Sequence, residues 1–237
     1  MCIVRKGEEK RLDILTVAEK MFCQKGYKET SVQDILDALN TSKGSFYHHF
    51  ESKEQVLATL CIQRAQKSAE TCMRVLGTVA EPMARINTVF HSIMPLRREE
   101  VAFLSMLLPQ ISTPEGRTVC LAYQDALHDA FTPLLDAVLD EARAAGLIFP
   151  PTEDGQSDIL LTMLNRCWLH VAQTLLESIK KAQRPEPAAL LDELTVYRAA
   201  IERLLDAPYG TVELIRLQEW YEVAQLVEHR VAAHMDD

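Results

Sequence analysis

The sequence predicts an all-helical protein, and three observations lead to this fold class. The chain of 237 residues holds 8 Gly and 10 Pro, and these lie between long periodic stretches rather than inside them. Within those stretches, apolar residues recur every three or four positions, as they do on one face of a helix. No segment of any length alternates apolar and polar residues as a strand would. With 48% hydrophobic and 25% charged residues, the chain can bury a core in one or two domains.

The first two expected helices end at residues that accept a left-handed backbone. Residues 10–25 place apolar side chains on one face, and Gly26 follows where helices commonly end. The next apolar stripe begins after Thr30 and Ser31, and either hydroxyl can cap its helix. Asn40 then breaks the stripe and, after glycine, tolerates a positive φ best.

A third short helix is expected over residues 43–49, where Thr41 and Ser42 precede it as possible caps. Two helices joined by a turn of about four residues form a helix-turn-helix pattern. In the segment TSKGSFYHHF, Phe46 and Phe50 are spaced to face a core, whereas the other residues are poor core material. Lysine, tyrosine and histidine side chains suit phosphate oxygens and base edges, so this helix is predicted to contact DNA.

Longer helices are expected to make up the rest of the chain. The sequence Ser52-Lys53-Glu54-Gln55 is a capping box that opens a helix over residues 53–76. At about 1.5 Å per residue this helix spans about 36 Å, enough to pass from the head into the body. Further helices are expected over residues 81–94, 98–108, 114–145, 157–181, 188–205 and 211–234.

The net charge of −9 is unevenly distributed along the chain. Residues 1–53 carry nine Lys and Arg against eight Asp and Glu, whereas the remainder carries 16 against 26. A near-neutral head on an acidic body is compatible with a small phosphate-contacting surface at one end.

Two composition features bear on where the protein resides. No apolar run approaches the roughly 18 residues needed to span a bilayer, and the N-terminus lacks the apolar core of a secretory signal. Six cysteines are scattered singly, which favours reduced thiols over a disulfide framework or a zinc site, although a redox-active cysteine is left open. We therefore expect a cytoplasmic protein with no membrane contact and no bound metal.

The segment GYKETSVQDILDALNTSKGSFYHHFESKEQVL resembles the DNA-binding head of the TetR family of transcriptional regulators. The Gly-Tyr pair, Ser-Lys-Gly, and Tyr-x-His-Phe followed by a lysine carry the resemblance, which covers about residues 10–60. Leu36, Asn40 and Thr41 replace residues that are more frequent in the family, and Thr41 could alter a base preference. Matched position by position, the resemblance implies that ten residues contact DNA: Thr30, Ser31, Gln33, Thr41, Lys43, Gly44, Tyr47, His48, His49 and Lys53.

The resemblance also implies a division into two domains. Residues 1–52 would form the helix-turn-helix DNA-binding domain and residues 53–237 a helical effector-binding and dimerisation domain. We expect a ligand-responsive regulator, by family default a repressor, that binds a palindromic operator as a homodimer and is released by a small-molecule effector. The helices over 157–181 and 188–205 are the expected dimer surface. Effector binding would tilt the helix over 53–76 and change the separation of the two heads.

An effector pocket should combine apolar walls with a few convergent polar groups. Each candidate taken alone is more often an ordinary core or surface residue, but together they suggest an organic effector of mixed polarity. Seven residues are the candidates for this pocket: His91, Met106, Tyr123, Gln124, His128, Asn165 and Trp168.

Two other classes of protein were compared with this hypothesis. An enzyme would need a nucleophile–base pair, a metal cluster or a phosphate-binding loop, but the seven histidines lack H-E-x-x-H spacing and no glycine-rich loop occurs. We therefore expect no catalytic site and no cofactor. The alternative that stays open is a helix-turn-helix DNA-binding protein without a small-molecule effector, architectural or regulated by a partner. The sequence does not define the operator, the effector, the target genes, the direction of regulation, or the role of the expected helix over 211–234.

Overall fold

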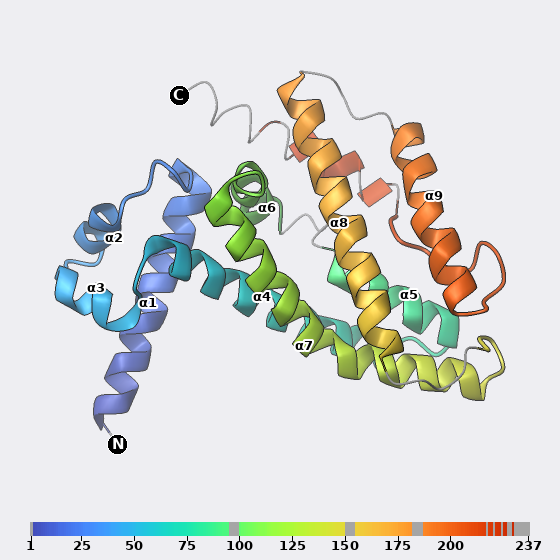
Figure 1. Cartoon of the computed structure of the whole chain (residues 1–237). Helices are drawn as coiled ribbons and strands as arrows, with labels where there is room; N and C mark the ends of the chain where they lie inside the picture. The colour runs from blue at the N-terminus through green and yellow to red at the C-terminus, as the bar shows by residue number, and fades with distance from the viewer. Residues whose placement is uncertain are drawn as a thin grey trace.

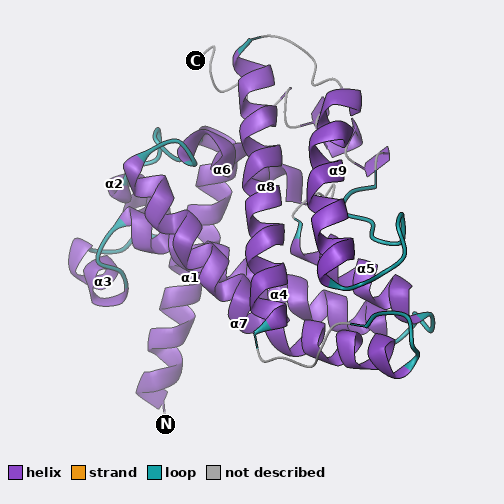
Figure 2. Ribbon diagram, turned by 45° about the vertical axis from the view of Figure 1, so that its right-hand side comes forward, coloured by secondary structure: helices purple, strands orange, loops and turns teal. Residues whose placement is uncertain are grey.

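The computed structural model describes residues 2–94, 100–149, 155–181 and 187–216, together with 218, 219, 221–223, 225, 226 and 229. Across these residues the secondary structure is helix, turn and loop without strands, which confirms the all-α fold class (Figure 2). None of the helices in this described part is long and apolar enough to cross a bilayer.

Three helices form the head at one end of the molecule: α1 (Cys2–Lys25), α2 (Val32–Ala38) and α3 (Lys43–His49) (Figure 1). α1 begins eight residues before the expected start, whereas α3 has the predicted bounds. Gly26 and Asn40 have φ values of 100° and 46°, so both adopt the left-handed backbone expected after the first two helices. Ser31, rather than Thr30, caps α2.

The body contains α4 (Lys53–Leu76), α5 (Pro82–Ile93), α6 (Val101–Leu107), α7 (Pro114–Ala144), α8 (Gln156–Lys180) and α9 (Pro187–Leu204). A short 3₁₀ turn, η2 (Leu108–Gln110), connects α6 to the loop before α7. α4 runs from the head into the body and packs along α7, while α8 and α9 lie side by side on the far side of the molecule (Figure 1). The expected helix bounds agree with these elements to within about three residues wherever the structure describes them.

The segment after α9 differs from the expectation of one helix over 211–234. Residues 211–216 are not helical, helical residues begin at 218, and residues 230–237 lie outside the described part. Side chains of the body bind this backbone: Asn87 donates to the carbonyl of Thr211 and accepts from the N–H of Glu213, both at 2.9 Å. The Glu202 carboxylate accepts from the N–H of Val212 at 3.1 Å. These bonds satisfy backbone groups that would otherwise pair within a helix.

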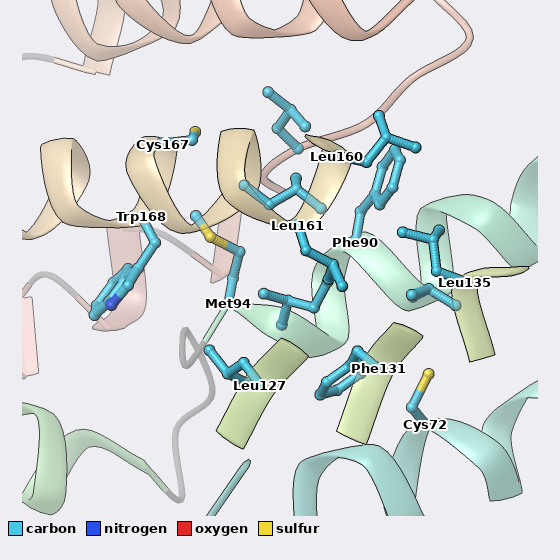
Figure 3. Close-up of a cluster of buried hydrophobic side chains, with 14 of the residues drawn as sticks. Cys72, Phe90, Met94, Leu127, Phe131, Leu135, Leu160, Leu161, Cys167 and Trp168 are labelled. Carbon is cyan, nitrogen blue, oxygen red and sulfur yellow. The ribbon is translucent and has the colours of Figure 1, made fainter. Parts of the chain in front are cut away.

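Two clusters of buried apolar side chains stabilise the fold. The body cluster runs from Ala65 in α4 through α5, α7, α8 and α9, and Figure 3 shows its centre around Phe131 and Leu161. The head cluster joins α1, α2 and α3 to the first part of α4 as far as Cys61, and it also includes Phe103 and neighbouring residues of α6. Because α4 belongs to both clusters, the core of the head extends beyond residue 52. The division at 52/53 stays a proposal.

Candidate DNA-binding surface and effector cavity

The helix-turn-helix is held together by a small apolar core. Ile35 and Leu36 of α2 are buried against Phe46 of α3, and Phe50 closes the same core directly after the helix. Burial of Phe46 and Phe50 confirms the prediction that these two rings face inward. The Ser31 hydroxyl accepts from the N–H of Asp34 at 3.1 Å, and the Asp34 carboxylate accepts from the N–H of Ser31 at 2.7 Å. This capping box fixes where α2 begins.

The ionic surroundings of Asp34 strengthen the same cap. Lys25 at the end of α1 lies 3.0 Å from the Asp34 carboxylate. Hydrogen bonding to Ser31, together with Lys25, lowers the pKa of Asp34 to about 2. The cap is therefore ionised and intact throughout the neutral range.

Six of the ten proposed DNA contacts are exposed at the surface of the head. The Tyr47 side chain is 56% exposed, although Tyr47 directly follows a fully buried phenylalanine in the chain. Thr41 and His49 are partly buried. Besides Tyr47, five of the proposed contacts are exposed: Ser31, Gln33, Lys43, Gly44 and His48.

Thr30 and Lys53 have structural roles that the sequence did not predict. Thr30 is 0% exposed and its hydroxyl donates to the carbonyl of Gly26 at 2.7 Å, so this hydroxyl is already bonded within the head. The Lys53 ammonium donates to the carbonyls of Tyr27 and Thr30 at 2.8 and 2.9 Å and lies 4.2 Å from the centroid of the Tyr27 ring. Its partial burial lowers the pKa of Lys53. Two of its three N–H donors hold the loop before α2, which leaves one donor for a phosphate.

His49 lies at the boundary between α3 and α1. Its ring approaches α1 near Gly7, and Arg11 of the same helix lies over the Phe50 ring at 5.1 Å. Partial burial, followed by the neighbouring basic side chains of His48, Arg11 and Lys10, lowers the pKa of His49. Basic side chains of α1 and α3 therefore lie close to the His49 ring.

A cavity of about 280 Å³ opens between α4, the end of α5, α6 and α7. Its apolar wall comes mainly from α6, and five polar residues of α4 form the opposite side. The lining residues from α4 are Arg64, Lys67, Ser68, Thr71 and Arg74, and those from the other elements are Met94, Glu100, Phe103, Leu104, Leu107 and Tyr123.

The sequence reasoning missed the five α4 residues, although a signal was present. They recur at three- and four-residue intervals, which places them on one face of a helix. A continuous polar stripe on a helix expected to enter the body indicates a solvent-filled or ligand-filled space rather than a core. The apolar stripe on the other face of the same helix is the stronger pattern and masks this signal.

The seven predicted pocket residues do not form one site, although Tyr123, Gln124 and Trp168 together line a small cavity of about 10 Å³. Tyr123 lines the cavity beside α4. Gln124, His128 and Asn165 instead line an open groove of about 650 Å³ between α7 and α8, together with Asp158, whose carboxylate lies 3.0 Å from Nδ1 of His128. This groove also holds further aspartates of α7, so it is polar and acidic.

The remaining three candidates are packed away from the cavity beside α4. Trp168 belongs to the body core and Met106 to the head core, and both are nearly fully buried (Figure 3 shows Trp168). His91 lies beneath the segment after α9, with Nε2 3.9 Å from the Glu213 carboxylate, and burial lowers its pKa. The side chains of these residues point into the core or toward the C-terminal segment because each lies on the side of its helix that meets another element.

Several known proteins resemble this chain in sequence or in structure. A family model described as bacterial regulatory proteins, tetR family, matches residues 14–60. The transcriptional repressor KstR2 of Mycolicibacterium smegmatis is 28% identical over 147 residues, covering 55% of this chain and 71% of KstR2. The transcriptional regulator UidR of Escherichia coli is 24% identical over 205 residues, covering 85% of this chain and 96% of UidR. Among solved structures, RolR in complex with the ligand resorcinol has a TM-score of 0.55 at 15% identity, covering 94% of this chain and 95% of RolR.

The head, with its buried core and exposed α3, defines a helix-turn-helix DNA-binding protein. Residues 14–60 match the tetR family of bacterial regulatory proteins, and the chain is similar to transcriptional regulators over most of its length. Its function is accordingly transcriptional regulation and not catalysis, as the sequence predicted.

Proposed function

We propose that the protein is a repressor that binds a palindromic operator as a homodimer and leaves it when a small-molecule effector binds the body. The observation that carries the DNA-binding part is the exposed face of α3, where Lys43 and Tyr47 project from a helix anchored by Phe46 and Phe50. Cationic and aromatic side chains on a short rigid helix suit phosphate and base-edge contacts in a major groove.

Pairing of two chains supports specificity, because one helix-turn-helix reads few base pairs. In a dimer, two copies of α3 would lie about 34–36 Å apart to enter successive major grooves. We assign the dimer surface to α8 and α9, as expected from the sequence. Val196 of α9 is 70% exposed and Ile159 of α8 is 52% exposed, so each helix keeps an apolar side chain on its surface. We assign DNA binding to residues 1–52 and dimerisation and effector binding to residues 53–237.

Effector release is supported by the position of the cavity beside α4. This helix begins at Lys53, which contacts the loop before α2, and its middle turns line the cavity. KstR2 and UidR are described as a transcriptional repressor and a transcriptional regulator, and RolR was solved with resorcinol. A ligand that prefers one position of α4 about 100-fold would supply about 2.7 kcal/mol toward the released state.

Selection of duplexes from a random pool, with the purified protein at low ionic strength, tests this function. We expect an enriched palindrome whose half-sites lie about 10 base pairs apart, and a sedimenting species of two chains. If no duplex is enriched, or if the protein sediments as one chain with DNA bound, the proposal is wrong. If an operator is found but no small molecule weakens its binding, the alternative of a regulator without an effector is correct.

A further inference from the structure

We propose that the cavity beside α4 binds an organic anion with an apolar tail or ring, and that the anion competes with the head for Arg64. This inference rests on the proposed function and names the ligand class and the contact through which it acts. It concerns the cavity lined by α4, α5, α6 and α7, and not the acidic groove between α7 and α8.

The charges around the cavity favour an anion. Among the described residues, three cationic side chains line it, Arg64, Lys67 and Arg74, against one carboxylate, that of Glu100. Even when Glu19, the second partner of Arg64, is included, the cations exceed the carboxylates. This local excess of positive charge occurs in a chain whose net charge is −9, so it departs from the general charge of the body.

The opposite wall of the cavity favours an apolar portion of the same ligand. Met94, Phe103, Leu104 and Leu107 line that side, and all four are at most a few per cent exposed. Tyr123 adds an aromatic ring with a hydroxyl group. A volume of about 280 Å³ lies just below the usual range for ligand sites, about 300–1,000 Å³. The cavity therefore suits a small amphipathic anion better than a large or wholly polar one.

Arg64 connects this cavity to the head. Its guanidinium forms ion pairs with Glu19 of α1 and with Glu100, the residue directly before α6, and it lies 4.0 Å from the centroid of the Phe103 ring of α6. The three helices α1, α4 and α6 are thus joined through one side chain. Among the residues that the structure describes, Nε of Arg64 is buried and has no hydrogen-bond partner. The guanidinium therefore has a donor left to offer to a ligand.

An anion bound beside Arg64 would compete with Glu19 for the same guanidinium. Arginine pairs carboxylates through two parallel N–H donors, so a ligand carboxylate in the cavity can take donors that now serve the head. Weakening the Glu19–Arg64 pair loosens α1 from α4, which is the helix that carries the head. The ligand then favours a different position of the head because it binds that state more tightly.

Calorimetry with matched pairs of small molecules tests the ligand class. The probes are octanoate against octan-1-ol, and 2-naphthoate against 2-naphthol, titrated into the full-length protein. We expect each carboxylate to bind at least tenfold more tightly than the alcohol with the same skeleton. If the alcohols bind as tightly, or if neither carboxylate binds below about 1 mM, which corresponds to about −4.1 kcal/mol, the proposed ligand class is wrong.

Single substitutions show whether carboxylates bind in the cavity beside α4. Two of them are used, so that the test still works if one variant does not fold. Arg64→Gln and Lys67→Gln should each weaken carboxylate binding at least fivefold, and Lys67 is exposed at the cavity, so its replacement spares the core. Arg166→Gln is the matched control, because Arg166 is an exposed arginine that lines the groove between α7 and α8. Weakening by Arg166→Gln, with Lys67→Gln unchanged, would place the site in that groove and overturn the proposal.

Glu19→Gln tests the competition for Arg64. This variant should still bind carboxylates, at least as tightly as the wild type, but its operator binding should respond to them at least threefold less. An unchanged response would overturn the competition. Operator binding without any carboxylate is measured in parallel, so failure of the proposed function, seen as no operator binding at all, is distinguishable from failure of this inference.

Discussion

The head and the body differ in how their functional residues are distributed along the chain. In the head, the proposed DNA-contacting residues fall within residues 30–53, and local helix geometry decides which of them are exposed. In the body, the cavity is lined by residues from α4 to α7, between positions 64 and 123. A site built from one segment follows from periodicity, whereas a site built from four helices depends on how those helices pack.

The sharpest test of this difference in the head uses two neighbouring aromatic residues. Phe46→Ala is expected to destabilise the head by about 3–5 kcal/mol, because it leaves a cavity where a fully buried ring was. DNA binding should be lost with the fold of the head. Tyr47→Ala removes an exposed ring that makes an edge contact with Phe46, so stability should change by less than about 1 kcal/mol.

The two variants should therefore separate stability from recognition. For Tyr47→Ala we expect operator affinity to fall roughly tenfold, as for loss of a contact worth about 1–3 kcal/mol. Urea unfolding and operator binding are measured on both variants. Equal loss of stability in both would mean that Tyr47 belongs to the core. Unchanged operator affinity in Tyr47→Ala would remove this residue from the interface.

A second test concerns the charge on the exposed face of α3. Lys43→Ala should weaken operator binding on every sequence by a similar factor and reduce the salt slope of log affinity by about 1, because one phosphate contact is lost. Lys181→Ala is the control, since Lys181 is an exposed lysine at the far end of α8 that pairs with Glu177. Fluorescence anisotropy at several salt concentrations measures both slopes. Equal slopes for the two variants would exclude a phosphate contact at Lys43.

The fold of the head could be predicted almost completely from the sequence. The bounds of α3 and α4 follow from Ser42 and Ser52, whose side chains accept from backbone N–H groups three residues later. The sequence could not decide whether Thr30 or Ser31 caps α2. Both carry the required hydroxyl, and packing of Thr30 against Gly26 decided between them.

The cavity and the C-terminal segment were predicted less well, for the same physical reason. The polar stripe of α4 acquires a function only because α6 brings Phe103 and Glu100 against Arg64, a contact across 36 residues or more. The segment 211–216 is non-helical because Asn87 and Glu202, distant in sequence, bind its backbone. Helix propensity depends on neighbouring residues in the sequence, so it cannot predict either of these long-range contacts.

The smallest expected effect tests whether His49 faces DNA. Because its pKa is lowered in the folded protein, the unfolded chain binds more protons below about pH 6.5. The contribution of His49 to the stability of the head is therefore fully present above that pH and is lost as the pH falls below it. DNA phosphates would counter the cations Lys10 and Arg11 and raise the pKa of His49 again, so operator binding should take up protons.

Operator affinity should consequently increase as the pH falls from 8 to 6, by at most about tenfold per pH unit for one proton. In His49→Gln this increase should be reduced, and the loss of stability at low pH should be reduced with it. His128→Gln is the matched control, because His128 lies in the groove between α7 and α8. As the pH falls, the stability of the head should decrease and operator affinity should increase. If His49 is buried without contacting DNA, its replacement should change only the pH dependence of unfolding. Anisotropy and urea unfolding at the same pH values therefore decide whether this ring belongs to the interface or only to the fold.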